Sequence, residues 1–241
     1  MRGMLAGLFA SLFAFGFAKV YGEPQVDRAI AFEEQVSHAA AGAAEVHEHA
    51  HEIVSREVQA TIGLLTGVVV YGTALGGLFA FAFAFVNGRL VRMTPRATAV
   101  LLAAAGFLAL YIVPYLKYPA SPTSVGLPET IGYRTQLYFA MIVFSLVALA
   151  IAIGAGRQLF AKLGPWNASL AGAATYVGLV GLAAYVLPPI NEVPAAFPAD
   201  LLWHFRIAAL GTQAILWTAL ALIFGALIER GSESRGALAR G

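Results

Sequence analysis

Six stretches of this chain contain no Asp, Glu, Lys or Arg, and each is 16 to 31 residues long. They are residues 3–18, 58–88, 97–116, 135–156, 163–191 and 207–228. A helix needs about 20 apolar residues to cross roughly 30 Å of hydrocarbon. Because these runs are continuous, and the strands of a membrane barrel would alternate in polarity, the pattern predicts membrane-spanning helices.

The expected fold class is all-α: a polytopic membrane helical bundle with six transmembrane helices in a single membrane domain, residues 1–241. The expected spans lie at about 4–21, 60–86, 97–115, 136–159, 168–188 and 207–228. Residues 22–59 are expected to form an outer loop rich in His and Glu, and 229–241 a tail. The first run also fits a cleaved signal peptide. Its Gly3/Gly7 spacing favours instead a retained helix that packs closely.

Basic residues predict the orientation of the bundle. Nine Lys and Arg fall on the side of the two termini, against six on the other side. Positively charged loops stay in the cytoplasm, so both termini are expected to be cytoplasmic. Composition agrees with a membrane protein, at 59% hydrophobic and 12% charged residues, where soluble domains have about 25% charged.

Composition also excludes several classes of function. No charge-rich stretch is long enough for a separate soluble domain, so we expect neither an enzyme nor a nucleic-acid partner. A pI near 9.0 says little in a membrane protein, where the positions of the charges matter more. The absence of cysteine excludes disulfides, thiolate metal sites and iron–sulfur clusters. No phosphate-binding loop motif is present, so we expect no ATP hydrolysis and no permanently bound cofactor.

Acidic residues and histidines gather on the predicted outer side. Only Glu229 and Glu233 of the thirteen acidic residues, and none of the five histidines, fall on the inner side. The densest outer stretch is residues 45–52, in which every second residue from 47 to 51 is a histidine. In an extended chain these imidazoles would project from the same face. The candidate metal ligands of this stretch, together with one earlier histidine, are His38, His47, Glu48, His49, His51 and Glu52. This set suits Zn²⁺, Ni²⁺, Co²⁺ or Cu²⁺; the alternative is a solvated loop without a specific site.

Two proline-rich outer loops carry further candidates. Each follows a predicted span, and proline restricts the backbone and leaves carbonyl oxygens free. Their polar residues predict the mouth of a cation path, and they are Glu129, Glu192, Asp200 and His204. The alternative is that Glu129 caps a helix and pairs with Arg134, while His204 lies at the membrane interface. No ionisable residue lies at mid-depth, so a path through the centre would use neutral groups such as Tyr71, Thr73, Thr175, Tyr176, Thr212 and Gln213.

The loop motifs resemble a known family. The segments 2–7, 22–27, 31–34, 58–67, 116–120, 128–135 and 197–203, for example Pro128-Glu129-Thr130-Ile131-Gly132-Tyr133-Arg134, are similar to the predicted cobalt transporter family CbtA, in its actinobacterial version. The resemblance implies a multi-pass subunit in the bacterial inner membrane that takes up Co²⁺. It also implies a small single-span, His-bearing partner (CbtB-like), and a variable His-rich first outer loop. The family has often been described with five spans.

The expected function is therefore uptake of a divalent transition-metal cation, captured by the outer His/Glu loop, and the resemblance implies that this cation is Co²⁺. A homo-oligomer remains open. The alternative from another class is a membrane scaffold or sensor that binds metal without transporting it. A third alternative is a permease for a different solute.

Overall fold

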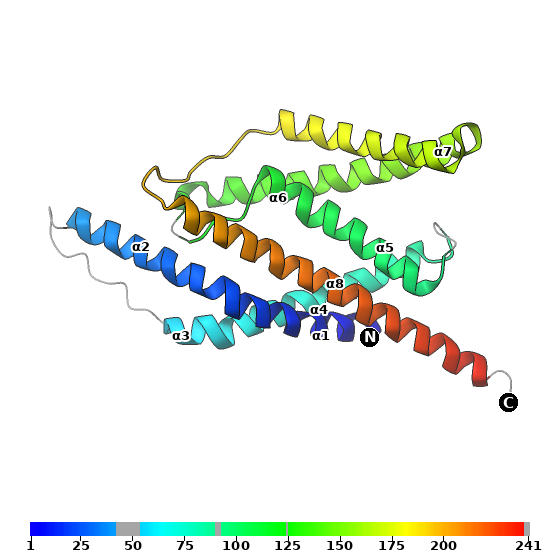
Figure 1. The fold of residues 1–241 in the computed structure, drawn as a ribbon, viewed down its shortest axis with the longest axis horizontal. Helices are drawn as coiled ribbons and strands as arrows, with labels where there is room; N and C mark the ends of the chain where they lie inside the picture. The colour runs from blue at the N-terminus through cyan, green and yellow to red at the C-terminus, as the bar shows by residue number, and fades with distance from the viewer. Residues whose placement is uncertain (42–53, 90–92, 124, 239–241) are drawn as a thin grey trace. The chain divides into compact units, whose positions relative to one another are not determined.

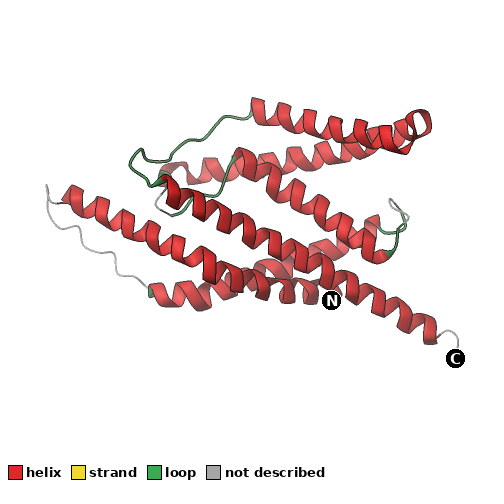
Figure 2. Cartoon of the chain, viewed as in Figure 1, coloured by secondary structure: helices red, strands yellow, loops and turns green. Residues whose placement is uncertain are grey.

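The described part of the chain consists of helices joined by loops and contains no β-strand (Figures 1 and 2). The structure, a computed structural model, describes residues 1–41, 54–89, 93–123 and 125–238. The α-helices are α1 (Arg2–Phe17), α2 (Glu23–Ala41), α3 (Arg56–Val58), α4 (Leu64–Val86), α5 (Pro95–Phe107), α6 (Val113–Lys117), α7 (Ile131–Val186) and α8 (Ala199–Leu238). Three π-helical turns lie between them, η1 (Ala18–Gly22), η2 (Gln59–Gly63) and η3 (Leu108–Ile112), and a 3₁₀ turn, η4 (Pro128–Thr130), precedes α7.

Five helical stretches in the described residues are long and apolar enough to cross a membrane. They are Arg2–His38, Arg56–Val86, Pro95–Lys117, Pro128–Val186 and Ala199–Arg230. The prediction of an all-helical membrane protein is therefore confirmed. One difference concerns the predicted outer loop, because its residues 23–41 continue the first helix as α2.

Two prolines explain two of the π-helical turns. Pro24 and Pro114 each stand two residues after such a turn, η1 and η3 respectively. A proline ring clashes with the carbonyl four residues earlier, and its nitrogen donates no hydrogen bond. Those carbonyls belong to Val20 and Leu110, which lie inside the two turns. A wider turn relieves the clash, so each helix continues through its proline instead of ending there.

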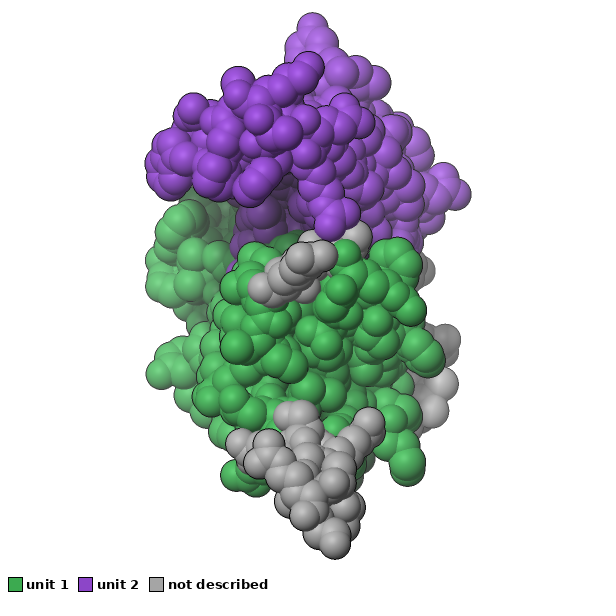
Figure 3. Space-filling view, turned by 90° about the vertical axis from the view of Figure 1, so that its right-hand side faces the viewer, with its two compact units in different colours: residues 1–105, 121–124, 196–241 green, residues 106–120, 125–195 purple. Residues whose placement is uncertain are grey.

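The chain divides into two compact units (Figure 3). Unit 1 comprises residues 1–105, 121–124 and 196–241, and unit 2 comprises residues 106–120 and 125–195. In unit 1, α1 packs against α4 and α8. Glycines bring α1 and α4 into backbone contact: a Cβ atom on Gly7 would overlap the carbonyl oxygen of Gly72, and one on Gly3 would overlap that of Gly76. Small residues permit such close approach between membrane helices.

Unit 2 is organised around α7, which folds back on itself. At about 1.5 Å per residue its 56 residues would be roughly 84 Å long if straight, far more than one membrane crossing needs. Gly164 has a left-handed φ of 75° and is followed by Pro165, so the helix reverses there (Figure 1). The two arms pack together through a core that includes Met141, Ala148 and Tyr176. The hydroxyls of Ser145 and Tyr176 are buried and hydrogen-bonded at 2.8 Å.

Candidate functional site

Half of the predicted metal ligands lie outside the described residues. These are His47, Glu48, His49, His51 and Glu52. His38 is exposed near the end of α2. Among the residues that the structure describes, no three His, Asp or Glu side chains come together in a group that could hold a metal ion. Of the remaining candidates, Glu192 belongs to a polar cluster in unit 2, and Asp200 and His204 belong to another in unit 1.

Glu192 is the centre of the cluster in unit 2. Its Oε2 accepts hydrogen bonds from the backbone N–H of Leu127 (2.9 Å) and the hydroxyl of Thr130 (2.8 Å). Arg134 Nε lies 3.4 Å from the same oxygen. The hydrogen bond from Leu127 lowers the pKa of Glu192 below its usual 4.5, whereas partial desolvation raises it. The hydrogen bond from Thr130 and the positive charge of Arg134 lower the pKa further. Glu192 is therefore ionised and joins two loops that are distant in sequence.

Gly126 lets Arg134 reach this position. A Cβ atom on Gly126 would overlap Arg134 Nη1, so the guanidinium occupies the space that a side chain would fill. The backbone of Gly126 also has a φ of +110°, which residues with a side chain rarely adopt. Arg134 thus pairs with Glu192, whereas the sequence left open a pairing with Glu129. Glu129 itself is exposed in η4.

Tyr118 makes a second connection between the same loops. Its hydroxyl donates a hydrogen bond to the carbonyl oxygen of Pro188 at 2.8 Å. Burial raises the pKa of Tyr118, and the nearby Tyr133 raises it further, so the hydroxyl stays protonated and able to donate. The ammonium of Lys117 lies 5.8 Å from the centre of the Tyr118 ring. The hydrogen bond from Tyr118 to Pro188 and the contacts of Glu192 together hold the loop after α6 against the loop after α7.

Asp200 and His204 form a cluster in unit 1, at the start of α8. The Nδ1 atom of His204 lies 2.8 Å from the carbonyl oxygen of Asp200 and 3.1 Å from its carboxylate. Because both neighbours are acceptors, Nδ1 carries the proton in the neutral ring and Nε2 carries the lone pair. Arg28 of α2 lies 3.6 Å from the other carboxylate oxygen of Asp200. Asp200 therefore orients His204 and connects α8 to α2.

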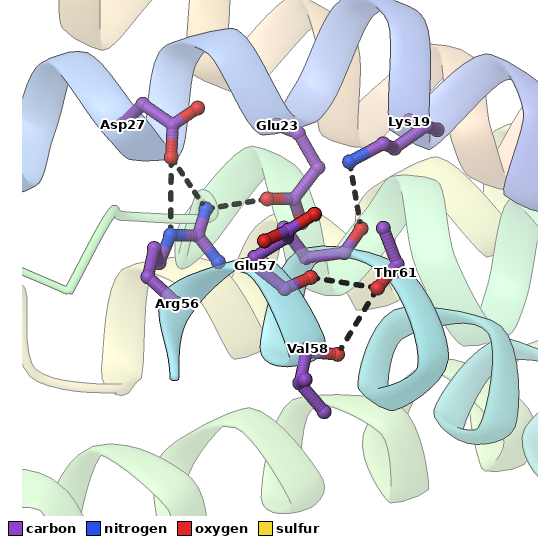
Figure 4. Close-up of polar contacts among 8 residues, drawn as sticks. Lys19, Glu23, Asp27, Arg56, Glu57, Val58 and Thr61 are labelled. Carbon is purple, nitrogen blue, oxygen red and sulfur yellow. Dashed lines mark hydrogen bonds and ion pairs between the residues drawn. The ribbon is translucent and has the colours of Figure 1, made fainter. Parts of the chain in front are cut away.

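A third cluster, in unit 1, joins α2 to α3 and was not predicted from the sequence (Figure 4). Arg56 makes a short charge-assisted hydrogen bond to Glu23, and its Nε donates to Asp27 at 3.0 Å. Lys19 in η1 donates to the carbonyl oxygen of Ala60 in η2 at 3.0 Å. The spacing of Glu23 and Asp27, four residues apart on one helix face, was the available signal. We call Lys19, Glu23, Asp27, Arg56 and Ala60 the cross-helix cluster.

The neutral groups inside the spans divide into two kinds. Thr175 and Thr212 donate to backbone carbonyls of their own helices at 2.8 and 2.9 Å, and Tyr176 pairs with Ser145. Within the described residues, the buried atoms Thr73 Oγ1 and Gln213 Oε1 have no hydrogen-bond partner. Threonine and tyrosine hydroxyls in the first group thus stabilise the helices.

Comparisons with known proteins place nearly the whole chain in one family. The family model described as "Probable cobalt transporter subunit (CbtA)" matches residues 1–229. This stretch contains all five candidate spans except Arg230, the last residue of the fifth. Residues 230–241 lie beyond it. No curated protein and no solved structure matches the chain.

Proposed function

The chain belongs to the family of probable cobalt transporter subunits (CbtA), and from this premise we propose that it is a membrane subunit that takes up Co²⁺. The match over residues 1–229 is the observation that carries this proposal. The five apolar helices support it, since a permease for a hydrated divalent ion must span the bilayer. Ni²⁺ and Zn²⁺ prefer similar ligands and are the competing cargoes.

We assign the capture of the cation to His47, His49 and His51, together with the candidate ligands Glu48, Glu52 and His38. Neutral imidazoles and carboxylates are the ligands that Co²⁺ favours where no thiolate is present.

Further ligands on the outer side are proposed in each unit separately. In unit 2 the exposed Glu129 is available to a cation. In unit 1 His204 offers Nε2, because Asp200 holds its other ring nitrogen. Glu192 keeps the loops of unit 2 in place through its ion pair with Arg134.

The proposal includes six crossings with both termini in the cytoplasm of a bacterial cell, in its inner membrane. The reversal of α7 at Gly164 supports two crossings by that helix, residues 131–163 and 165–186. The excess of Lys and Arg on the side of the termini supports the orientation. In this topology the histidines face outward.

Movement of the ion needs a source of free energy. The sequence carries no phosphate-binding loop motif, so the membrane potential is the proposed source. Two elementary charges that enter a negative interior gain roughly 4.6 kcal/mol per 100 mV. We further propose a small single-span partner that bears histidine, and self-association of the chain as the other route to a complete path.

The test is Co²⁺ uptake into liposomes that contain the purified chain, with and without an interior-negative potential. Wild-type uptake should rise with the potential. Replacement of His47, His49 and His51 by Ala should raise the KM for Co²⁺ by about tenfold or more, because ligands are lost. The matched control replaces Val46 and Ala50 by Ser in the same segment and should leave KM unchanged. An unchanged KM in the histidine variant would show that these histidines do not capture the ion.

A second candidate function is a scaffold or sensor that binds the metal without transporting it. The lack of any three-ligand group among the described residues favours this candidate, since the spans themselves then offer no site for the ion. The same liposomes separate the two functions. Binding of Co²⁺ without flux, in the presence and absence of a potential, would support the scaffold and reject the transporter.

A further inference from the structure

The helix pair formed by α1–η1–α2 and α3–η2–α4 keeps a single antiparallel register from Gly3 to Glu23. Gly3 faces Gly76 and Gly7 faces Gly72, and further along Lys19 reaches Ala60 and Glu23 reaches Arg56. Each step of four residues along the first helix thus matches a step of four back along the second. The turns η1 and η2 lie opposite each other, so the extra residue of one compensates for that of the other.

The two halves of this pair are held by different interactions. Over Gly3–Gly7 the backbones touch, and a single added carbon would clash. At the level of η1 and η2 several large apolar side chains are exposed: Val20 and Tyr21 in η1, Ile62 in η2 and Val58 just before it are 40% to 65% exposed. These side chains therefore contribute little to the contact between the two helices at this level.

Polar contacts take over at this level. The side chain of Glu23 is only 11% exposed and that of Arg56 29%, so their ion pair is partly shielded from water. Asp27 is more exposed and receives both Nε and the terminal nitrogen of Arg56. One guanidinium thus holds two carboxylates one helical turn apart, a fork geometry that a Lys ammonium does not reproduce (Figure 4).

We propose that Arg56 is a positioning residue, which fixes the start of α3 to the start of α2 through Glu23 and Asp27. The chain that carries the histidines leaves from the far end of α2 and returns at Arg56. Its return point is therefore set beside Glu23 and Asp27, at the start of α2 and within the first candidate span, Arg2–His38. The consequence for uptake rests on the proposed function: with Arg56 in place, the captured ion is delivered near that span.

The direct test measures the separation of α2 and α3 without any metal. The chain contains no cysteine, so spin labels can be attached to Val36→Cys and Val54→Cys, which are 50% and 45% exposed. Electron–electron double resonance should give a narrow distance distribution in the otherwise wild-type chain. Arg56→Gln should broaden it, and the charge exchange Glu23→Arg with Arg56→Glu should narrow it again. The matched control is Glu57→Gln, which removes an exposed charge one residue away and should leave the distribution narrow.

The transport test separates positioning from a general loss of structure. In liposomes, Arg56→Gln should raise the KM for Co²⁺ about fivefold, as expected from the loss of a partly shielded ion pair, with the maximal rate unchanged. The charge exchange should restore KM, and Arg56→Lys should fall between. An unbroadened distance distribution in Arg56→Gln overturns the proposal, and so does a fall in maximal rate that the charge exchange does not restore. If wild-type liposomes take up no Co²⁺, the proposed function fails, while the distance distributions still decide the role of Arg56.

Discussion

A single carboxylate, Glu192, joins two segments of unit 2 that the sequence leaves unconnected. Its partner Arg134 can reach it because Gly126 has a positive φ and no side chain. The guanidinium of Arg134 occupies the space that a side chain at position 126 would fill. Two hydrogen-bond donors and the charge of Arg134 stabilise the ionised form of Glu192, so the connection depends on ionisation. Glu192, which the sequence suggested as a metal ligand, thus has structural partners within the protein.

This ionisation predicts a pH dependence. The pKa of Glu192 is lower in the folded chain than its usual 4.5, so the stabilisation it provides is complete above about pH 4.5 and is lost as the pH falls through the folded pKa. Hydrogen exchange of the Leu127 amide, corrected for the intrinsic effect of pH, should therefore show protection that disappears in acid. In Glu192→Ala this protection should be absent at every pH.

The Tyr118 amide is the internal control for this measurement. It donates to the carbonyl oxygen of Pro114 at 2.7 Å, within the end of α6, and has no carboxylate partner in that bond. Its protection should persist through the range in which Leu127 loses its own. Simultaneous loss at both amides would mean that acid unfolds the whole unit and that Glu192 is not the responsive group.

At the scale of elements, the helices of this chain contain glycine and proline at positions where a wider turn, a reversal or a close helix contact accommodates them. Pro24 and Pro114 are accommodated by π-helical turns, and Gly164 reverses α7. Gly3 and Gly7 of α1 have a different role, since they let two helix backbones touch. The same residue type therefore has opposite effects on helix stability and helix packing, and only the contact decides which dominates.

Two glycines on α1 provide a matched pair to test this point. Gly7→Ala should destabilise the protein by about 1–3 kcal/mol, because its new Cβ would overlap the Gly72 carbonyl and force the helices apart. Gly16→Ala, on the same helix with nothing within 4 Å of its Cβ position, should be neutral or stabilising by up to about 1 kcal/mol, because alanine favours helix. Thermal unfolding in detergent compares the two. Equal effects would argue against backbone contact between α1 and α4.

For the whole molecule, the fold of α7 and the orientation of the bundle are linked. If α7 crosses twice, the loops that hold Glu129 and Asn191 lie on the same side of the membrane. If it crosses once, they lie on opposite sides. In the case of two crossings, the positive-inside bias predicts that this common side is the exterior.

Single-cysteine variants test this topology, since the chain has no cysteine of its own. In intact cells an impermeant maleimide should label Val54→Cys, Glu129→Cys and Asn191→Cys, and should label Lys162→Cys only after the cells are opened. Labelling of Glu129→Cys without Asn191→Cys would mean one crossing by α7. Labelling of Lys162→Cys alone in intact cells would reverse the orientation and replace uptake by export.

The sequence by itself determined the helical membrane class, the approximate position of the apolar segments and the family. These follow from local properties: the length of an apolar run must match the bilayer, and loop motifs are contiguous. The absence of ionisable residues from the middle of the predicted spans was also evident from the sequence. Residues 23–41 were the exception: the charges of Glu23, Asp27, Arg28, Glu33 and Glu34 led to the prediction of a loop, whereas these residues form helix α2.

Only the tertiary structure decided which charges meet. Arg134 pairs with Glu192, and Arg56 with Glu23 thirty-three residues away, because helices fold back on one another in a particular register. That register depends on glycine contacts, on paired π-helical turns and on the reversal at Gly164, each a relation between distant segments. Spacing along one chain segment carries no information about such relations, whereas packing of the helices fixes them.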